Sequence, residues 1–173
     1  MPTELPSAAQ EQSHTPHFEP GKEKWTPLAF LDRIPAMAVE MEIVYEGGLH
    51  NRAKHGPSGQ VITTDAPVDN GGKGTAFSPT DLVGAALGAC MLTIMGKVAE
   101  RNGIDLRGTT VRVTKEMASD PVRRIKRLGV VLTLPAGLTL SPENRAKLEN
   151  AAHTCPVKQS LHPDVIVDIV FNG

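Results

Sequence analysis

A run of fifteen residues without a charged side chain, Leu82–Gly96, constrains the fold of this chain more than any other feature. Asp81 and Lys97 bracket the run, which is shorter than the roughly 20 apolar residues that a membrane-spanning helix needs. A helix that is apolar on all sides is typical of the buried centre of a protein. We therefore predict a central, buried helix in a soluble, cytoplasmic protein that has no membrane partner.

Signals for the start and the end of this helix stand on either side of the run. Ser78 is a preferred N-cap residue, Pro79 suits the first helical position, and Asp81 follows three residues after the cap, as in a capping box. The Asn-Gly pair that follows Arg101 supplies a stop signal. The sequence therefore predicts a helix over residues 79–101.

Two glycines interrupt this helix at helical spacing. Gly84 and Gly88 are four residues apart and lie on one helical face. A glycine inside a helix costs roughly 1 kcal/mol relative to alanine, so we expect both to permit the close approach of another backbone. In a dimer, that backbone would belong to the partner subunit.

Alternating apolar side chains predict strands on both sides of the helix. The strands before it are expected over 38–46, 49–54 and 60–64, and those after it over 109–117 and 122–134. A second helix capped by Ser141 is expected over 143–153, with a short third helix after Pro156 and a last strand that carries Val165, Val167, Ile169 and Phe171. This order predicts an α+β fold in which antiparallel sheets cover apolar helices. The first strand is predicted to be half-buried, with Val39, Met41, Ile43 and Tyr45 on one side.

The sequence divides into an N-terminal extension and a single domain. The chain has 173 residues, enough for one compact domain and a further segment. Residues 1–20 are polar and indicate a mobile tail, whereas 25–35 contains apolar residues that are expected to dock on the domain or on a partner. We therefore predict an N-terminal extension, 1–35, and one domain, 36–173.

Composition and motifs argue against several classes of function. A net charge of −1 gives no general attraction to nucleic acid or to an anionic membrane. The basic cluster at 123–127 has no interleaved aromatic residue, so a solvated strand face is the better interpretation. The glycine-rich segment 71–74 lacks the Lys-Ser/Thr ending of a phosphate-binding loop, which favours a flexible loop over a pocket. The N-terminus shows no pattern typical of a signal peptide.

Two cysteines, 65 residues apart, are the residues that could carry chemistry. Cys90 lies in the apolar helix, where a free cysteine is usually a small buried hydrophobe. Cys155 precedes Pro156, and Thr154 is a candidate cap for the short third helix, whose N-terminus would lower the pKa of the thiol. The alternative for Cys155 is a half-buried loop cysteine. In a cytoplasmic protein a cysteine pair is more often redox-active than a permanent crosslink, so a redox pair is the leading hypothesis.

A metal site built on the cysteines and two histidines is a further alternative. The sequence contains no Cys-x-x-Cys or His-x-x-x-His spacing that would support it. We therefore expect neither a metal nor a cofactor.

Two segments of the chain resemble the OsmC/Ohr family. The first runs from Gly71-Gly72-Lys73 through Phe77–Leu82 to Ala85–Cys90 and resembles the first-cysteine helix of that family, and the second, Ala151–Val157, resembles its second-cysteine segment. The two motifs occur in the family's order and at its separation, and the resemblance covers about residues 39–171.

The resemblance implies an intertwined homodimer with its active site at the subunit interface, and thiol-dependent peroxidase activity on organic hydroperoxides. It assigns Cys90 as the peroxidatic cysteine, which is oxidised to a sulfenic acid, and Cys155 as the cysteine that resolves it as a disulfide. It further implies an arginine and an acidic residue beside the thiolate, for which Arg52 and Asp81 are the nearest positions. The expected reductant is a dithiol.

A second hypothesis assumes the same fold without catalytic activity. The chain would then be a non-catalytic OsmC-like dimer that binds an apolar ligand or senses oxidants without turnover. The rate at which Cys90 is oxidised by an organic hydroperoxide discriminates between the two.

Overall fold

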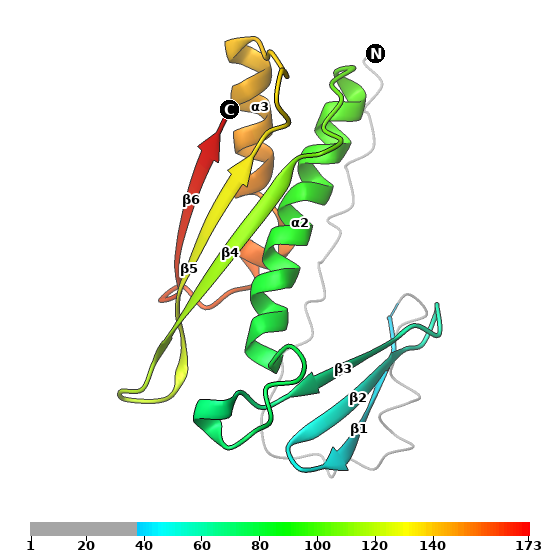
Figure 1. Cartoon of the computed structure of the whole chain (residues 1–173). Helices are drawn as coiled ribbons and strands as arrows, with labels where there is room; N and C mark the ends of the chain where they lie inside the picture. Colours follow the sequence, from blue (N-terminus) through cyan, green and yellow to red (C-terminus); the bar gives the residue numbers. More distant parts are fainter. Residues whose placement is uncertain (1–37) are drawn as a thin grey trace, which may run out of the picture. The chain divides into compact units, whose positions relative to one another are not determined.

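The computed structural model describes residues 38–173, of which Glu40–Gly173 form one compact unit. Figure 1 shows the order of the elements along the chain. They are β1 (Met41–Gly47), β2 (His50–His55), β3 (Val61–Asp65), the 3-10 turn η1 (Val68–Asn70), α2 (Pro79–Arg101), β4 (Thr110–Ala118), β5 (Arg124–Thr133), α3 (Pro142–His153), α4 (Pro156–Gln159) and β6 (Ile166–Asn172). The predicted extension, 1–35, lies outside the described residues.

Strands β1, β2 and β3 form an antiparallel sheet in chain order, as the sequence predicts. The pairing register puts Met41, Ile43 and Tyr45 on one face of this sheet, together with Ala53 and Ile62. We call these five residues the apolar face of the first sheet. The opposite face carries charged side chains, which include Glu42, Lys54, Glu46 and Arg52.

The prediction that β1 is half-buried is wrong for the single chain. Met41, Ile43 and Tyr45 remain 59%, 61% and 62% exposed. The physical reason is that the described hydrophobic core takes its residues from α2, β4, β5, β6, α3, α4 and the loops between them, and none from the first sheet. The alternating sequence therefore correctly predicts that β1 has an apolar face. The described part of the chain leaves that face exposed.

The second sheet is mixed, which corrects the prediction of antiparallel sheets alone. Strand β5 pairs antiparallel with β4, but β6 pairs parallel with β5. Parallel neighbours need a long crossover connection, and the segment that contains α3 and α4 provides it. The alternation that predicts the last strand is confirmed, since Val165, Val167, Ile169 and Phe171 all pack against the core.

Helix α2 begins and ends where the sequence predicts. The Ser78 side chain accepts a hydrogen bond from the Asp81 N–H, and the Asp81 carboxylate accepts one from the Ser78 N–H, which completes the capping box. Asn102 forms the C-cap, and Gly103 follows with a positive φ of 65°. Among the described residues α2 is the helix long and apolar enough to cross a membrane by length and composition, a test that core helices also pass.

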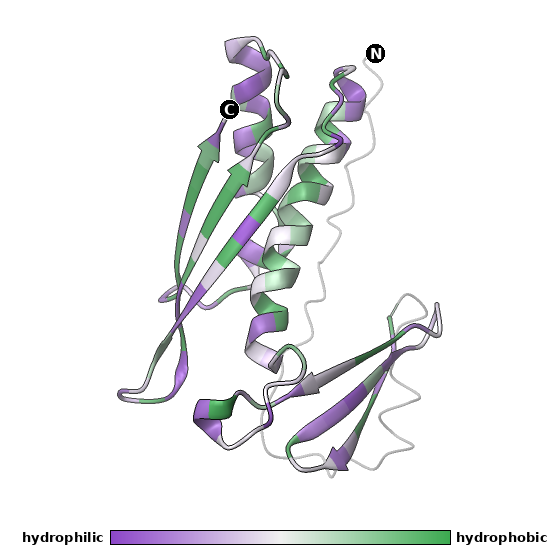
Figure 2. Cartoon of the chain, viewed as in Figure 1, coloured by the Kyte–Doolittle hydropathy of each residue, from purple (hydrophilic) through white to green (hydrophobic). Residues whose placement is uncertain are grey.

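The described chain buries one side of α2, so the prediction of a central, buried helix is met only in part. One stripe of the helix is buried, comprising Gly84, Leu87, Gly88, Met91, Met95 and Ala99. A second stripe of small side chains, Ala85, Ala86, Ala89 and Thr93, is exposed. Figure 2 shows that α2 is hydrophobic or neutral over most of its length, whereas α3 carries more hydrophilic positions. The described elements cover only one side of a helix that is apolar on both.

The two helical glycines pack against a strand of the same chain. A Cβ atom on Gly88 would lie 3.1 Å from side-chain carbons of Val111 and Val113, and one on Gly84 would lie 3.4 Å from Val113. Both valines belong to β4. The close approach that the glycines permit in this chain is therefore that of α2 to β4, and their role in a dimer contact stays a prediction.

Candidate thiol site

The structure brings the two cysteines together from different elements. Cys90 lies in the middle of α2 and is half-buried, and Cys155 lies just after α3 and is fully buried at 0% exposure. Both are free thiols. Cys90 packs against the core cluster that contains Cys155, and it raises the pKa of the Cys155 thiol, so the two side chains are neighbours. The pairing that the resemblance implies is therefore sterically available within one subunit.

Cys155 itself caps the short helix α4. Thr154 is instead the C-cap of α3, and the Cys155 side chain accepts a hydrogen bond from the Lys158 N–H at 3.4 Å. Pro156 occupies the first position of α4, just as a proline begins each of the two longer helices. The local sequence thus fixes the Cys155 side chain at a helix start, one position later along the chain than the predicted cap.

The prediction that this helix start lowers the pKa of Cys155 is wrong in its net direction. Burial raises the pKa of the Cys155 thiol above its usual value, and Cys90 raises it further, while the Lys158 N–H opposes the shift. A fully buried sulfur loses the hydration that would stabilise a thiolate, and the first turn of a four-residue helix does not replace it. Cys155 is therefore held as a neutral thiol at neutral pH.

The structure pairs Arg52 with a carboxylate of its own sheet. Its Nε atom donates to Oε1 of Glu46 at 2.7 Å, and both side chains remain more than a third exposed. This ion pair lies on the charged face of the first sheet, opposite the apolar face. Arg52 is therefore placed on the N-terminal sheet as predicted, but its approach to a thiol stays a prediction.

Asp81 lies in the first turn of α2 and not beside Cys90 of the same chain. Asp81 and Cys90 are nine positions apart along the helix, which corresponds to roughly 13.5 Å of rise and about two and a half turns, so the two residues lie on opposite sides of α2. Burial raises the pKa of the Asp81 carboxyl, but hydrogen bonds from Lys115 and Ser78 outweigh it and hold the pKa below its usual value. Asp81 is therefore an ionised carboxylate that lies away from Cys90 of its own chain, and its predicted place beside a thiolate stays a prediction.

The glycine-rich loop after β3 is held by a buried carboxylate that the sequence analysis did not identify. Asp65 is 1% exposed, and its Oδ2 atom accepts hydrogen bonds from the Thr75 N–H at 3.0 Å and the Thr75 hydroxyl at 2.8 Å. These two bonds hold the pKa of Asp65 below its usual value. The signal in the sequence is an aspartate that ends a strand just before a loop rich in glycine. The end of the loop is therefore tethered at Thr75, and the flexibility of residues 71–74 stays a prediction.

Two clefts border the start of α2. The larger, of about 860 Å³, is lined mainly by apolar and small side chains of α2 and β4 and by the loop segment Gly74–Phe77. The second, of about 670 Å³, includes residues of the first sheet, the η1 turn and the cap of α2. Neither is lined by Cys90 or Cys155. Within residues 38–173, no three His, Cys, Asp or Glu side chains are grouped so that they could hold a metal ion.

Comparison with protein families identifies one that accounts for most of this domain. The sequence profile of the OsmC-like protein family matches residues 72–170, more than half of the chain. None of the curated proteins is a significant match to the sequence.

Several solved structures share the fold. A protein from Psychrobacter arcticus named for an osmotic stress induced and detoxification response is 42% identical, with a TM-score of 0.74 over 81% of this chain and 99% of its own. The organic hydroperoxide resistance protein OsmC of Legionella pneumophila is 18% identical, with a TM-score of 0.64 over 81% and 100%. An organic hydroperoxide resistance protein of Elizabethkingia anophelis is 17% identical, with a TM-score of 0.64 over 80% and 98%.

Proposed function

Because the chain belongs to the OsmC-like protein family, we propose that it is a thiol-dependent peroxidase that reduces organic hydroperoxides through Cys90 and Cys155. The observation that carries the proposal is that two free thiols, Cys90 and Cys155, lie close together and differ in their burial. Cys90 is half-buried and accessible, whereas Cys155 is sealed in the core. A peroxide that enters the site therefore meets Cys90 first.

The proposed cycle has two chemical steps and a reduction. The Cys90 thiolate attacks one oxygen of the hydroperoxide, the O–O bond breaks, and the organic part leaves as an alcohol after it takes up a proton. Cys90 is left as a sulfenic acid. The Cys155 thiolate then attacks the Cys90 sulfur, a disulfide forms and water leaves. An external dithiol returns both cysteines to thiols and is itself oxidised to a disulfide.

The proposal includes a homodimer and a cytoplasmic location, where reduced dithiols are available. Two apolar surfaces that residues 38–173 leave exposed support the dimer: the apolar face of the first sheet, and the exposed stripe of small residues on α2. Monomeric proteins rarely leave contiguous apolar patches of this kind in water. In the proposed dimer, Asp81 and Arg52 of one subunit would lie beside the Cys90 thiol of the other.

The test of the proposed function is the substrate preference of Cys90 oxidation. Stopped-flow measurements would compare the second-order rate constant with cumene hydroperoxide against that with hydrogen peroxide. We expect the organic hydroperoxide to react faster, because the walls around Cys90 are apolar and favour an apolar substituent on the peroxide. Slow oxidation by both peroxides would refute a peroxidase.

The buried position of Cys155 predicts a strong pH dependence for the resolving step. The thiolate is the attacking species, and burial raises the pKa of the Cys155 thiol, so the thiolate is a minor species at neutral pH. Its fraction grows about tenfold per pH unit below the pKa, so disulfide formation should accelerate about tenfold from pH 7 to pH 8. Rapid alkylation and mass spectrometry would measure it after one equivalent of peroxide. A rate that does not change between pH 6 and pH 8 would contradict the assignment.

One observation favours the non-catalytic alternative. The cleft of about 860 Å³ is lined by apolar and small side chains, among them Phe77, Leu92, Val111 and Val113, but not by a cysteine. Such a space suits a small apolar ligand. An OsmC-like dimer that binds a ligand there would show ligand-dependent thermal stabilisation in Cys90→Ser, without any consumption of peroxide.

A further inference from the structure

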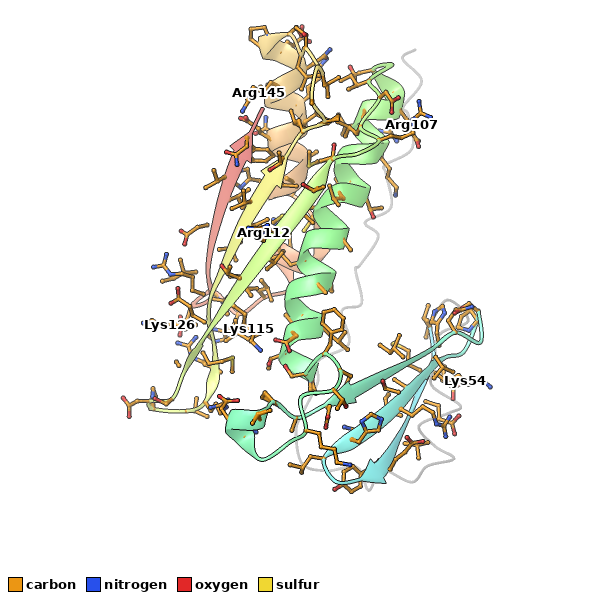
Figure 3. The ribbon with its side chains drawn as sticks, viewed as in Figure 1. Lys54, Arg107, Arg112, Lys115, Lys126 and Arg145 are labelled. Carbon is orange, nitrogen blue, oxygen red and sulfur yellow. The ribbon has the colours of Figure 1, made fainter. Side chains whose placement is uncertain are left out.

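Lys115 is a half-buried cation at the start of α2. It projects from β4, and its side chain is only 19% exposed. Figure 3 shows it extending toward the first turn of the helix, where its ammonium donates to Oδ1 of Asp81 at 2.5 Å, to the Thr80 hydroxyl at 2.8 Å and to the Ser78 hydroxyl at 3.3 Å. A lysine ammonium has three protons, so these acceptors satisfy it completely.

The position of Lys115 in its strand is unusual for a charged residue. In β4 the outward positions carry Thr110, Arg112, Thr114 and Glu116, and the less exposed positions between them carry Val111, Val113, Lys115 and Met117. A lysine on the inward side of a strand loses hydration, which is costly unless it is paired. Its place is therefore explained by its partners at the helix start and not by a need for surface charge.

Lys115 fixes the orientation of the Asp81 carboxylate. Lys115 occupies Oδ1, and the Ser78 N–H donates to Oδ2 at 2.8 Å, so both carboxylate oxygens are held. Removal of the ammonium would leave Oδ1 without its charged partner and free the carboxylate to turn. Asp81 and Lys115 are also the two residues that line both clefts, so the pair forms the wall between them.

We propose that Lys115 is a positioning residue for the thiol chemistry, which acts by holding Asp81 in the orientation needed at the Cys90 site of a second subunit. This inference rests on the proposed function, because Asp81 lies on the side of α2 opposite to Cys90 of its own chain. Lys115 touches no reacting atom in this arrangement. Its effect on the reaction is transmitted through the Asp81 carboxylate alone.

A double-mutant cycle on the full chain tests the inference. The rate constant for oxidation of Cys90 by cumene hydroperoxide is measured in the wild type, Lys115→Met, Asp81→Asn and the double variant. Lys115→Met should slow the reaction roughly tenfold, and the double variant should be no slower than Asp81→Asn alone. Lys115→Arg should restore part of the rate. Lys126→Met, on an exposed position of the same sheet, should leave the rate unchanged.

The outcomes separate this inference from the function on which it rests. If Asp81→Asn slows the reaction and Lys115→Met does not, or if the two losses add, Lys115 does not act through Asp81 and the inference is overturned while the peroxidase stands. If Asp81→Asn reacts at the wild-type rate, Asp81 has no role at the thiol and the inference fails with it. A wild type that does not react with cumene hydroperoxide refutes the proposed function itself. Should Lys115→Met not fold, Lys115→Gln, which keeps a donor without the charge, replaces it in the cycle.

Discussion

Cys90→Ser is expected to abolish the consumption of cumene hydroperoxide. A serine hydroxyl is not ionised near neutral pH, so the variant retains no nucleophile at the half-buried position of Cys90. Cys155 cannot substitute, because it is fully buried and its raised pKa keeps it protonated. Loss of peroxide over time, measured by the ferrous–xylenol orange assay, should fall to the rate without protein.

The matched variant Cys155→Ser should behave differently in the first turnover. Cys90 is intact, so one equivalent of peroxide per subunit is still consumed, and the product is a Cys90 sulfenic acid without a resolving partner. Dimedone trapping and mass spectrometry should detect the sulfenic acid, and further peroxide should convert it to sulfinic acid. The wild type should instead show a reversible Cys90–Cys155 disulfide within one subunit.

The order of these effects decides the assignment. If Cys155→Ser does not react with the first equivalent while Cys90→Ser does, the roles of the two cysteines are reversed. If the oxidised wild type contains no disulfide, the two-cysteine mechanism is refuted, and Cys90 returns to the simpler interpretation of a small core residue in α2.

Much of the chain path could be predicted from local signals. The Ser-Pro pairs that start α2 and α3 and the Asn-Gly pair that ends α2 act within one helical turn, so the sequence specifies them without knowledge of the rest. The alternation of β6 is likewise confirmed, because one face of that strand packs on the core of its own chain. The OsmC-like assignment is confirmed by the family profile over residues 72–170.

The features that could not be predicted depend on contacts between distant segments. Hydropathy shows that α2 and β1 carry apolar faces, but not which of those faces the chain itself covers. The parallel pairing of β6 depends on the crossover through α3, and alternation is the same in both strand directions. The raised pKa of Cys155 results from burial, which outweighs a helix start that is visible in the sequence. The sequence contains one signal for the role of Lys115, which is a charged residue at an inward position of an alternating strand.

Ile43→Lys is expected to convert the proposed dimer into a monomer. Ile43 lies at the middle of the apolar face of the first sheet and is 61% exposed in the single chain. Burial of a lysine ammonium against an apolar partner surface, without a counter-charge, costs as much as the loss of an interface hot spot, so the dissociation constant should rise roughly thirtyfold or more. Light scattering at micromolar concentration would report a dimer for the wild type and a monomer for the variant.

The neighbouring residue supplies the control. Val44 is 37% exposed on the opposite, charged face of the same sheet, across from Arg52 and on the same face as Glu42 and Glu46. Val44→Lys places the same charge one residue along the same strand, where water and the two glutamates surround it, so it should remain a dimer. If both variants stay dimeric, the apolar face of the first sheet is not the subunit contact. If the wild type is monomeric, no second subunit brings Asp81 to Cys90, and the thiol site must be complete within one chain.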